Sequence, residues 1–220
     1  MKTSKLKETA LRVVILLAGL MIAHLGITLF LLAELGSDPF DVLIQGIFRS
    51  LDRALSVSFL THGRVHLFIS LLIILILLFA DRSYIKIGTV ICMAFGGPII
   101  DMFTVLLNPI FEGGLSLALR IVLNAIGCCI LAFGMTIVIK SEAGTGPNDL
   151  VAVVISDKLK KRFSVIRVLV DFGFALIGWL LGGTVGIGTV ICAFLVGPIA
   201  GVFLPFNEKW IQKTVSRLVG

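Results

Sequence analysis

The sequence contains few charged residues and no long polar stretch. Charged residues make up 15% of its 220 residues, against about 25% in an ordinary soluble domain. Because a soluble domain needs a polar surface, this shortage excludes a large soluble domain. Instead, 58% of the residues are hydrophobic and the mean hydropathy is +1.10. Such a composition predicts one compact, all-α integral membrane protein, with the lipid bilayer as its surroundings.

The sequence also lacks the patterns of a metal site, a disulfide framework or an enzyme. The four cysteines, Cys92, Cys128, Cys129 and Cys192, all lie inside apolar runs, which favours small buried packing residues. No nucleophile elbow, phosphate loop or zinc motif occurs in the sequence. We therefore expect no enzymatic activity, no cofactor and no metal.

The net charge of +6 does not indicate nucleic-acid binding. The basic residues are spread over short segments between the apolar runs, whereas nucleic acid needs clustered contacts to its phosphates. In a membrane protein, Lys and Arg favour the cytoplasmic side, and their distribution here predicts that both termini are cytoplasmic. The first apolar run is too long for a signal peptide, so we expect an uncleaved first span.

Six apolar runs are candidates for membrane-spanning helices. They are Val13–Ala33, Val65–Ala80, Ile87–Leu107, Ile121–Ile139, Val165–Leu181 and Val185–Phe206. A bilayer core about 30 Å thick needs roughly 20 apolar residues per helix. The second and fifth runs are shorter, so each of them begins a turn earlier or lies in a thinned bilayer.

Two segments of the chain are repeated. Arg12–Asp41 and Arg120–Asp149, which are 108 positions apart, are identical at ten of thirty positions. Ile87–Phe103 and Ile187–Phe203, which are 100 positions apart, are identical at ten of seventeen, including an unbroken Ile-Gly-Thr-Val-Ile-Cys. Apolar bias alone does not produce matched glycines, prolines and acids. The matches therefore predict an internal duplication.

The duplication divides the chain into two units of three spans each, residues 1–110 and 111–220. Because three is an odd number, the second unit enters the bilayer from the opposite side. The sequence thus predicts a 3+3 inverted repeat. This architecture is typical of secondary transporters, whose substrate site lies near the membrane midplane where the repeats meet.

A polar motif follows the first span of each unit. The two motifs are Glu34-Leu-Gly-Ser-Asp-Pro-Phe-Asp41 and Glu142-Ala-Gly-Thr-Gly-Pro-Asn-Asp149. In each motif a glycine is expected to end the long helix. Ser37, Asp38 or Thr145 is then expected to cap a new helix whose first residue is proline.

The new helices, Pro39–Leu51 and Pro147–Leu159, are too short to cross the bilayer. They are either surface helices or re-entrant half-helices whose N-termini point at a substrate from opposite sides. The second interpretation defines a candidate binding site. Its predicted substrate-binding residues are Asp38, Pro39, Asp41, Arg64, Thr145, Pro147, Asn148, Asp149 and Arg167.

Ionisable residues inside predicted spans are costly, so each is a functional candidate. Asp171 follows Arg167 by four residues, so the two can pair along one helix face, either for structural neutralisation or for coupling. Arg64 and Arg167 also fit snorkelling to the membrane surface, and His24 fits either packing or proton relay. The predicted coupling residues are His24, Glu34, Asp101, Glu142 and Asp171. Asn124 is expected to hydrogen-bond across helices.

The paired Gly-Ser-Asp-Pro-Phe-Asp and Gly-Thr-Gly-Pro-Asn-Asp motifs, with the two Ile-Gly-Thr-Val stretches, resemble the YczE/YyaS/YitT family of small bacterial membrane proteins. The resemblance covers nearly the whole chain. It implies a bacterial inner-membrane location and a transporter-like fold, and it assigns no substrate or catalytic residue.

Two kinds of function fit these patterns, and a third, a membrane-embedded enzyme, would need a reactive group facing a lipid-accessible cleft. The first is a secondary transporter that moves an unknown small-molecule substrate by alternating access. The second is a non-transporting membrane subunit, either a substrate-capture component or a scaffold, for which Lys158–Arg162 is a candidate docking segment. The sequence leaves open whether the chain acts alone, as a homodimer or with a partner membrane protein.

Overall fold

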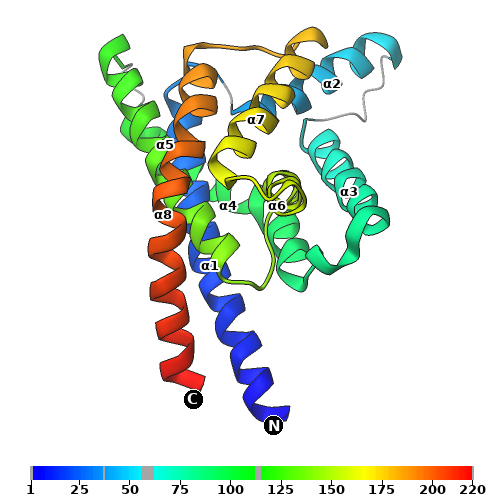
Figure 1. Ribbon diagram of the computed structural model, residues 1–220. Helices are drawn as coiled ribbons and strands as arrows, with labels where there is room; N and C mark the ends of the chain where they lie inside the picture. Colours follow the sequence, from blue (N-terminus) through cyan, green and yellow to red (C-terminus); the bar gives the residue numbers. More distant parts are fainter. Residues whose placement is uncertain (1, 37, 56–61, 112–114, 220) are drawn as a thin grey trace.

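The computed structural model describes residues 2–36, 38–55, 62–111 and 115–219, and these residues form helices and turns without any strand. The helices are α1 (Lys2–Leu32), α2 (Pro39–Leu55), α3 (His62–Asp81), the short 3-10 helix η1 (Arg82–Tyr84), α4 (Ile87–Phe111), α5 (Leu117–Lys140), α6 (Pro147–Leu159), α7 (Phe163–Leu180) and α8 (Ile187–Val219). Both chain ends lie at the same end of the molecule (Figure 1).

Each of the six predicted spans corresponds to one helix, although Ala33, Leu181 and the two residues before Ile187 lie outside the helices. In the described part of the chain, α1, α4, α5, α7 and α8 are long and apolar enough to cross a membrane, whereas the apolar part of α3, Val65–Phe79, is shorter. The sixth predicted span ends at Phe206, but α8 continues to Val219 because no helix breaker interrupts its amphipathic end.

The core lies where α1, α5 and α8 pack together. Its buried side chains include Phe30 of α1, Met135 of α5 and Val196 of α8. α1 and α5 run antiparallel at very short range because small residues face each other. A Cβ atom on Gly134 would lie 2.7 Å from the Gly19 carbonyl oxygen, and one on Gly26 would lie 2.6 Å from the Gly127 carbonyl oxygen. The repeated glycines thus let two backbones touch.

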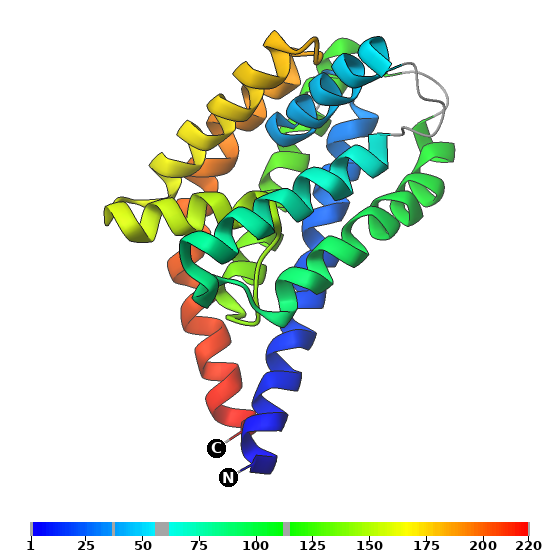
Figure 2. The same cartoon turned by 90° about the vertical axis from the view of Figure 1, so that its right-hand side faces the viewer.

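The two short helices, α2 and α6, pack inside the molecule with their N-terminal halves. Val42 and Ile44 of α2 and Leu150 and Ala152 of α6 are buried, and α6 lies crosswise to the long helices (Figure 2). α6 has the predicted bounds, while α2 extends one turn beyond the predicted Leu51. The end of α6 emerges at the surface, where Asp157 and the residues after it are exposed.

The turns after α1 and α5 have the same unusual backbone. Glu34 and Glu142 adopt positive φ angles of 52° and 59°, and Gly36 and Gly144 follow with 122° and 144°. The expectation that a glycine ends each long helix is therefore wrong. The glutamate supplies the first left-handed residue, and the glycine supplies the second, more extreme one that only glycine adopts without strain.

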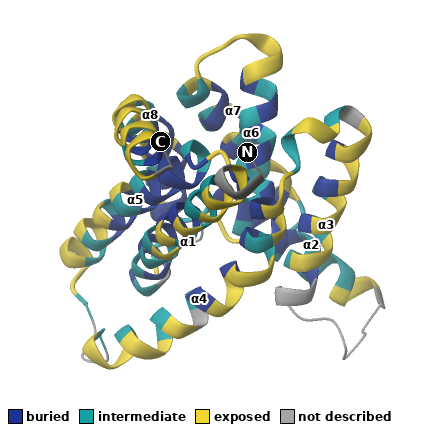
Figure 3. Cartoon of the chain, turned by 90° about the horizontal axis from the view of Figure 1, so that it is seen from below, coloured by how far each residue is buried: buried dark blue, intermediate teal, exposed yellow. Residues whose placement is uncertain are grey.

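The outer faces of α3, α4 and α7 are apolar and exposed. Phe68 and Phe79 of α3, Val105 of α4 and Phe172 of α7 are examples, and the view from below shows this exposed surface surrounding a buried interior (Figure 3). A water-soluble protein rarely exposes apolar patches of this extent. The surface is suited to contact with lipid.

Candidate functional site

A buried arginine on α7 lies at the centre of the candidate site. The Arg167 Nε–H donates to Asp171 Oδ2 over 2.8 Å, one turn further along α7. The Arg167 guanidinium also donates to Asp149 Oδ1, in the first turn of α6. Only 5% of the Arg167 side chain is exposed. The predicted pairing along α7 is present, and the alternative that Arg167 snorkels to the surface is wrong.

The N-terminus of α2 points toward the same arginine. Asp38 caps α2, because its Oδ1 accepts hydrogen bonds from the backbone N–H groups of Phe40, at 3.0 Å, and Asp41, at 3.5 Å. Asp41, Asp171 and Arg167 all lie within electrostatic range of the Asp38 carboxyl. Burial and the neighbouring carboxylates raise the pKa of Asp38 to about 8. Two helix N-termini therefore meet beside α7.

The N-terminus of α6 is not capped as the sequence predicted. Gly146 occupies the N-cap position and no side chain caps the helix, so the expected cap by Thr145 is wrong. Thr145 lies one residue too early: its backbone N–H donates to Thr89 Oγ1 over 3.4 Å, and its own buried hydroxyl has no hydrogen-bond partner. Pro147 begins α6 and is buried, and Asn148 is half-buried beside it.

Pro39 begins α2 and is buried, as expected for the first residue of a packed helix. Ser37 lies outside the described residues. Arg64 and Asp101 lie in α3 and α4, and their side chains are also outside the described part of the structure. The roles predicted for Arg64 and Asp101 stay predictions.

Three of the predicted coupling residues lie on α1, or in the turns after α1 and α5. The His24 Nδ1 lies 2.8 Å from the Leu20 carbonyl oxygen, and Asp149 is among the electrostatic neighbours of the ring. Glu34 and Glu142 are instead in exposed ion pairs, with Arg120 at 2.9 Å and with Arg12 at 2.8 Å. The structure thus places His24 near the buried cluster and the two glutamates in surface contacts.

Two predictions about packing residues are wrong. Asn124 is buried, but neither its Oδ1 nor its Nδ2 has a hydrogen-bond partner, so it makes no bond across helices. Its counterpart in the first unit is Leu16, which is also buried. Cys92, Cys128 and Cys192 are buried as expected, whereas Cys129 is exposed on the outer face of α5.

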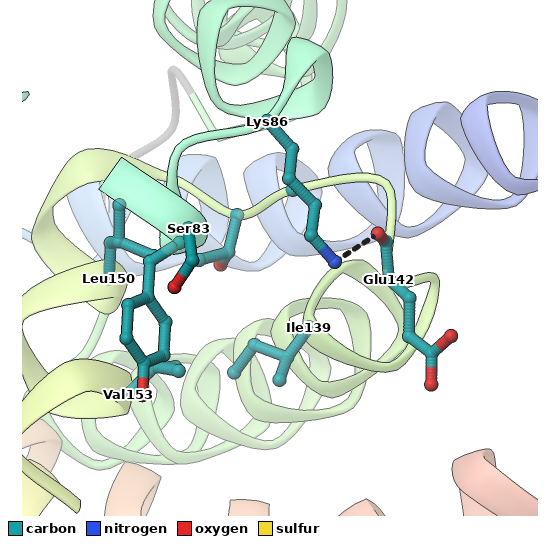
Figure 4. A pocket seen from close by; sticks show the side chains of 9 residues that line it. Ser83, Lys86, Ile139, Glu142, Leu150 and Val153 are labelled. Carbon is teal, nitrogen blue, oxygen red and sulfur yellow. Dashed lines mark hydrogen bonds between the residues drawn. The ribbon is translucent and has the colours of Figure 1, made fainter. Parts of the chain in front are cut away.

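A pocket of about 350 Å³ opens beside the second polar motif. Its lining includes Ser83, Lys86, Glu142, Thr145 and Leu150. Lys86 reaches across it and donates to the Glu142 carbonyl oxygen over 2.8 Å (Figure 4). Thr145 and Leu150 flank the first turn of α6, so the pocket lies next to the residues that precede Asp149.

The described residues of α2 are hydrogen-bonded to the turn between α7 and α8. Arg49 donates to the Gly182 carbonyl oxygen at 2.7 Å and to Thr184 Oγ1 at 3.0 Å. The Thr184 backbone N–H donates to Gln45 Oε1 at 2.6 Å, and Ser50 donates to the Leu181 carbonyl oxygen at 2.8 Å. α2 is thus fastened to the turn between α7 and α8.

The sequence did not reveal these closing contacts, nor the pair between Arg167 and Asp149. Gln45, Arg49 and Thr184 stand in no motif, and the partners are more than a hundred residues apart. For Asp149, the available signal was the repeated proline-led motif. This motif indicated Asp149 as a site residue but did not predict its pairing with Arg167.

The fold and the exposed apolar helices define a multi-pass membrane protein. A family profile adds the particular group: residues 10–205 match the Family of unknown function (DUF6198), and the chain belongs to that family. This agrees with the resemblance found in the sequence motifs.

Three relatives cover most of the chain. It is 26% identical over 214 residues to the uncharacterized membrane protein YczE of Bacillus subtilis. These matched residues cover 96% of this chain and 94% of the relative. It is 27% identical to the uncharacterized protein YyaS of the same organism, over 87% of this chain and 91% of the relative. An uncharacterized protein of Haemophilus influenzae is 30% identical, over 86% of this chain and 82% of that relative. No solved structure matches the chain.

Proposed function

We propose that the protein is a secondary transporter that moves a small solute by alternating access, with no enzymatic step. The substrate site lies between the N-termini of α2 and α6. The observation that carries the proposal is the buried Arg167, which joins Asp149 of α6 to Asp171 of α7 within electrostatic range of Asp38. Ionisable groups inside a membrane protein are retained for substrates, ions or protons, and helix N-termini are suited to bind negatively charged groups.

The proposal includes a 3+3 inverted repeat, which is supported by reciprocal contacts between the units. The carbonyl oxygen of Ala143 accepts from the Gly88 N–H at 2.9 Å, and that of Leu35 accepts from the Gly188 N–H at 2.8 Å. Under the two repeat offsets these contacts are equivalent. The ion pairs of Arg12 with Glu142 and of Arg120 with Glu34 are equivalent in the same way. Reciprocal contacts of this kind are expected when two copies are related by a twofold axis.

Alternating access is supported by the difference between the two sides of the site. The side of the α3–α4 turn holds the pocket beside Thr145, while on the side of the α7–α8 turn Arg49 and Gln45 make hydrogen bonds that hold α2 against that turn. In an inverted repeat, each side can adopt the arrangement of the other. The structure then corresponds to a state open toward the end that carries both termini.

For the location, we propose the bacterial inner membrane with both termini cytoplasmic. The relatives reported above are bacterial proteins, and YczE is described as a membrane protein. Exposed basic residues occur at the termini's end of the molecule, where Lys and Arg favour the cytoplasm. The pocket would then open to the cytoplasm.

A second candidate function is a non-transporting subunit that captures a substrate or holds a partner membrane protein. The observation that favours it is the exposed basic segment at the end of α6 and just after it, residues 158–162. A surface of one charge sign is suited to steer an acidic partner. Transport by the purified protein alone decides between the two functions.

The test of transport is uptake by the purified protein in liposomes, measured against a panel of labelled metabolites. We expect Asp149→Asn and Asp41→Asn to reduce uptake at least about tenfold, because each changes a charge at the N-terminus of α2 or α6. The matched controls are Asp157→Asn on α6 and Asp52→Asn on α2, both exposed, which should transport normally. No flux with any solute, together with co-purification of another membrane protein, would favour the subunit instead.

The test of the inverted repeat is the side from which equivalent turns are labelled. Ser83 lies in the α3–α4 turn and Val185 in the α7–α8 turn, and both are exposed. In a cysteine-free background, Ser83→Cys should react with a membrane-impermeant maleimide from the cytoplasmic side only, and Val185→Cys from the other side only. Labelling of both from one side would exclude the repeat.

A further inference from the structure

The Arg167 guanidinium serves two carboxylates at once, those of Asp149 and Asp171. When all three groups are ionised, the cluster carries one net negative charge. It is also shielded from solvent, because the exposed fractions of the two carboxylate side chains are 15% for Asp149 and 0% for Asp171. An uncompensated buried charge is strongly disfavoured. The cluster therefore favours the binding of one further positive charge.

Asp171 provides a position for that charge. Its Oδ2 accepts from Arg167, whereas its Oδ1 is buried and has no hydrogen-bond partner. A buried carboxylate oxygen without a donor is rare in native proteins and points to a group that is bound there. A single added proton on such an oxygen removes one negative charge from the cluster and turns the acceptor into a donor.

Asp38 is the second carboxylate at this position. It caps α2 and lies within electrostatic range of Asp171. Two carboxylates that interact in a shielded site do not both ionise readily, and their titration belongs to the pair rather than to either residue. The arrangement thus favours one proton held between α2 and α7.

Resting on the proposed transport function, we propose that Asp38 and Asp171 together hold one exchangeable proton, and that this proton is the coupling ion. A metal cation needs several oxygen ligands around it. A proton needs a single unpartnered oxygen, and Asp171 Oδ1 is one. Chains of carboxylates serve as proton relays in membrane pumps and transporters.

Other titratable groups face this pair from the helices packed against it. They are Arg167 of α7, Asp149 of α6, Asp41 of α2, Cys192 of α8 with its hydrogen-bond partner Cys128 of α5, and His24 of α1 beyond Asp149. Arg167 opposes proton binding, and Asp149 and Asp41 favour it. The proton on the pair is therefore held by a balance of charges from both units of the chain.

The position of the pair suggests how the proton is linked to movement. Asp38 belongs to the first unit and Asp171 to the second. With a proton bound, the two carboxyls do not repel each other, and α2 stays against α7, where Arg49 closes that side. Loss of the proton restores the repulsion and favours separation of α2 from α7. Proton binding would therefore stabilise the state seen here.

The direct test is infrared spectroscopy of the purified full-length protein, which reports the C=O stretch of a protonated carboxylic acid. Near neutral pH, the wild type should show this band, and the band should disappear at strongly alkaline pH. Asp38→Asn and Asp171→Asn should each lower the pH at which the band disappears, because either substitution removes the repulsion between the two carboxylates while burial still favours the protonated form. Asp52→Asn, at an exposed position of α2, should leave that pH unchanged.

Three results would overturn the proposal. The first is the absence of a protonated band in the wild type near neutral pH. The second is a lowered pH of disappearance in only one of the two variants, which means that the two carboxylates do not share the proton. The third is loss of the band when sodium chloride replaces choline chloride at constant pH, which assigns the site to Na⁺. Asp38→Asn keeps the capping oxygen of α2, so it should fold even if Asp171→Asn does not.

The coupling role needs a separate measurement. Liposomes that contain the protein and a pH-sensitive dye should show proton movement when a transported solute is added, and Asp38→Asn should abolish that movement. A protonated band without any solute flux means that the transport function is wrong while the proton site stands. Solute flux without proton movement overturns the coupling role alone.

Discussion

The side chains of Arg167 and Asp171 are joined across one turn of α7 by a hydrogen bond of 2.8 Å, and both are almost completely buried. Asp149, from α6, shares the same guanidinium. A buried ion pair is no guarantee of stability, but removal of one partner leaves the other charge without compensation. The carboxylates of α6 and α7 therefore depend on the same counter-charge, the Arg167 guanidinium.

The first prediction concerns the loss of this guanidinium. Arg167→Gln leaves the carboxylates of Asp149 and Asp171 without a counter-charge, so we expect it to destabilise the protein by about 3 to 5 kcal/mol. Asp171→Asn should be milder, because Arg167 and Asp149 remain as a neutral pair. The measurement is the thermal unfolding midpoint in detergent. Arg162→Gln, at the exposed start of α7, is the control and should leave the midpoint unchanged.

The order of the variants is the informative result. If Asp171→Asn were as damaging as Arg167→Gln, the shared guanidinium would not explain the stability of this region. The variant Arg167→Gln combined with Asp171→Asn should be more stable than Arg167→Gln alone, because it removes one of the two stranded charges.

The second prediction concerns pH. The pKa of Asp38 is raised to about 8 in the folded protein, from about 3.9 in an unfolded chain. Between these values the folded state holds a proton that the unfolded state has released, so stability is highest at low pH and falls as pH rises through about 8. The unfolding midpoint should therefore decrease between about pH 4 and about pH 8 and level off above that.

The matched variants separate Asp38 from the other carboxylates. Asp38→Asn should flatten this pH profile and raise the midpoint at alkaline pH, since the amide needs no proton to stay neutral. Asp52→Asn, exposed on the same helix, should reproduce the wild-type slope. An unchanged slope in Asp38→Asn would show that other groups cause the pH dependence.

The helices themselves were readable from the sequence. The six apolar runs located α1, α3, α4, α5, α7 and α8, and the proline-led motifs located the start of α2 and of α6. These signals are local: helix length follows from continuous apolar composition, and proline at the first turn follows from its missing N–H. The buried pair along α7 was also local, because four residues make one helical turn.

The contacts between helices could not be read in this way. Asp149 contacts Arg167 only because α6 packs against α7. Arg49 contacts Thr184 only because α2 packs against the turn between α7 and α8. Asn124 shows the same limit, since its polar amide suggested a bond that the packing does not provide. Tertiary arrangement decides such partners, and residue type alone does not.

The third prediction tests the close approach of α1 and α5. A Cβ on Gly134 would overlap the Ala23 backbone and lie 2.7 Å from the Gly19 carbonyl oxygen, so Gly134→Ala should push the helices apart at a cost of about 1 to 3 kcal/mol. Gly173→Ala is the control, because nothing lies within 4 Å of its Cβ position. It should leave the unfolding midpoint unchanged or raise it slightly. Equal midpoints for the two variants would contradict the observed packing.

The fourth prediction concerns the closed side of the site. Arg49 fastens α2 to the α7–α8 turn through Gly182 and Thr184, so Arg49→Ala should let α2 separate from that turn more often. In a cysteine-free background, a thiol placed at Val42, which is fully buried beneath this contact, should then react several-fold faster with a small maleimide. Lys86→Ala, on the side of the pocket, removes a comparable cation and should leave that rate unchanged. If both variants accelerate labelling equally, the effect is general loosening, and Arg49 has no specific role in closing the site.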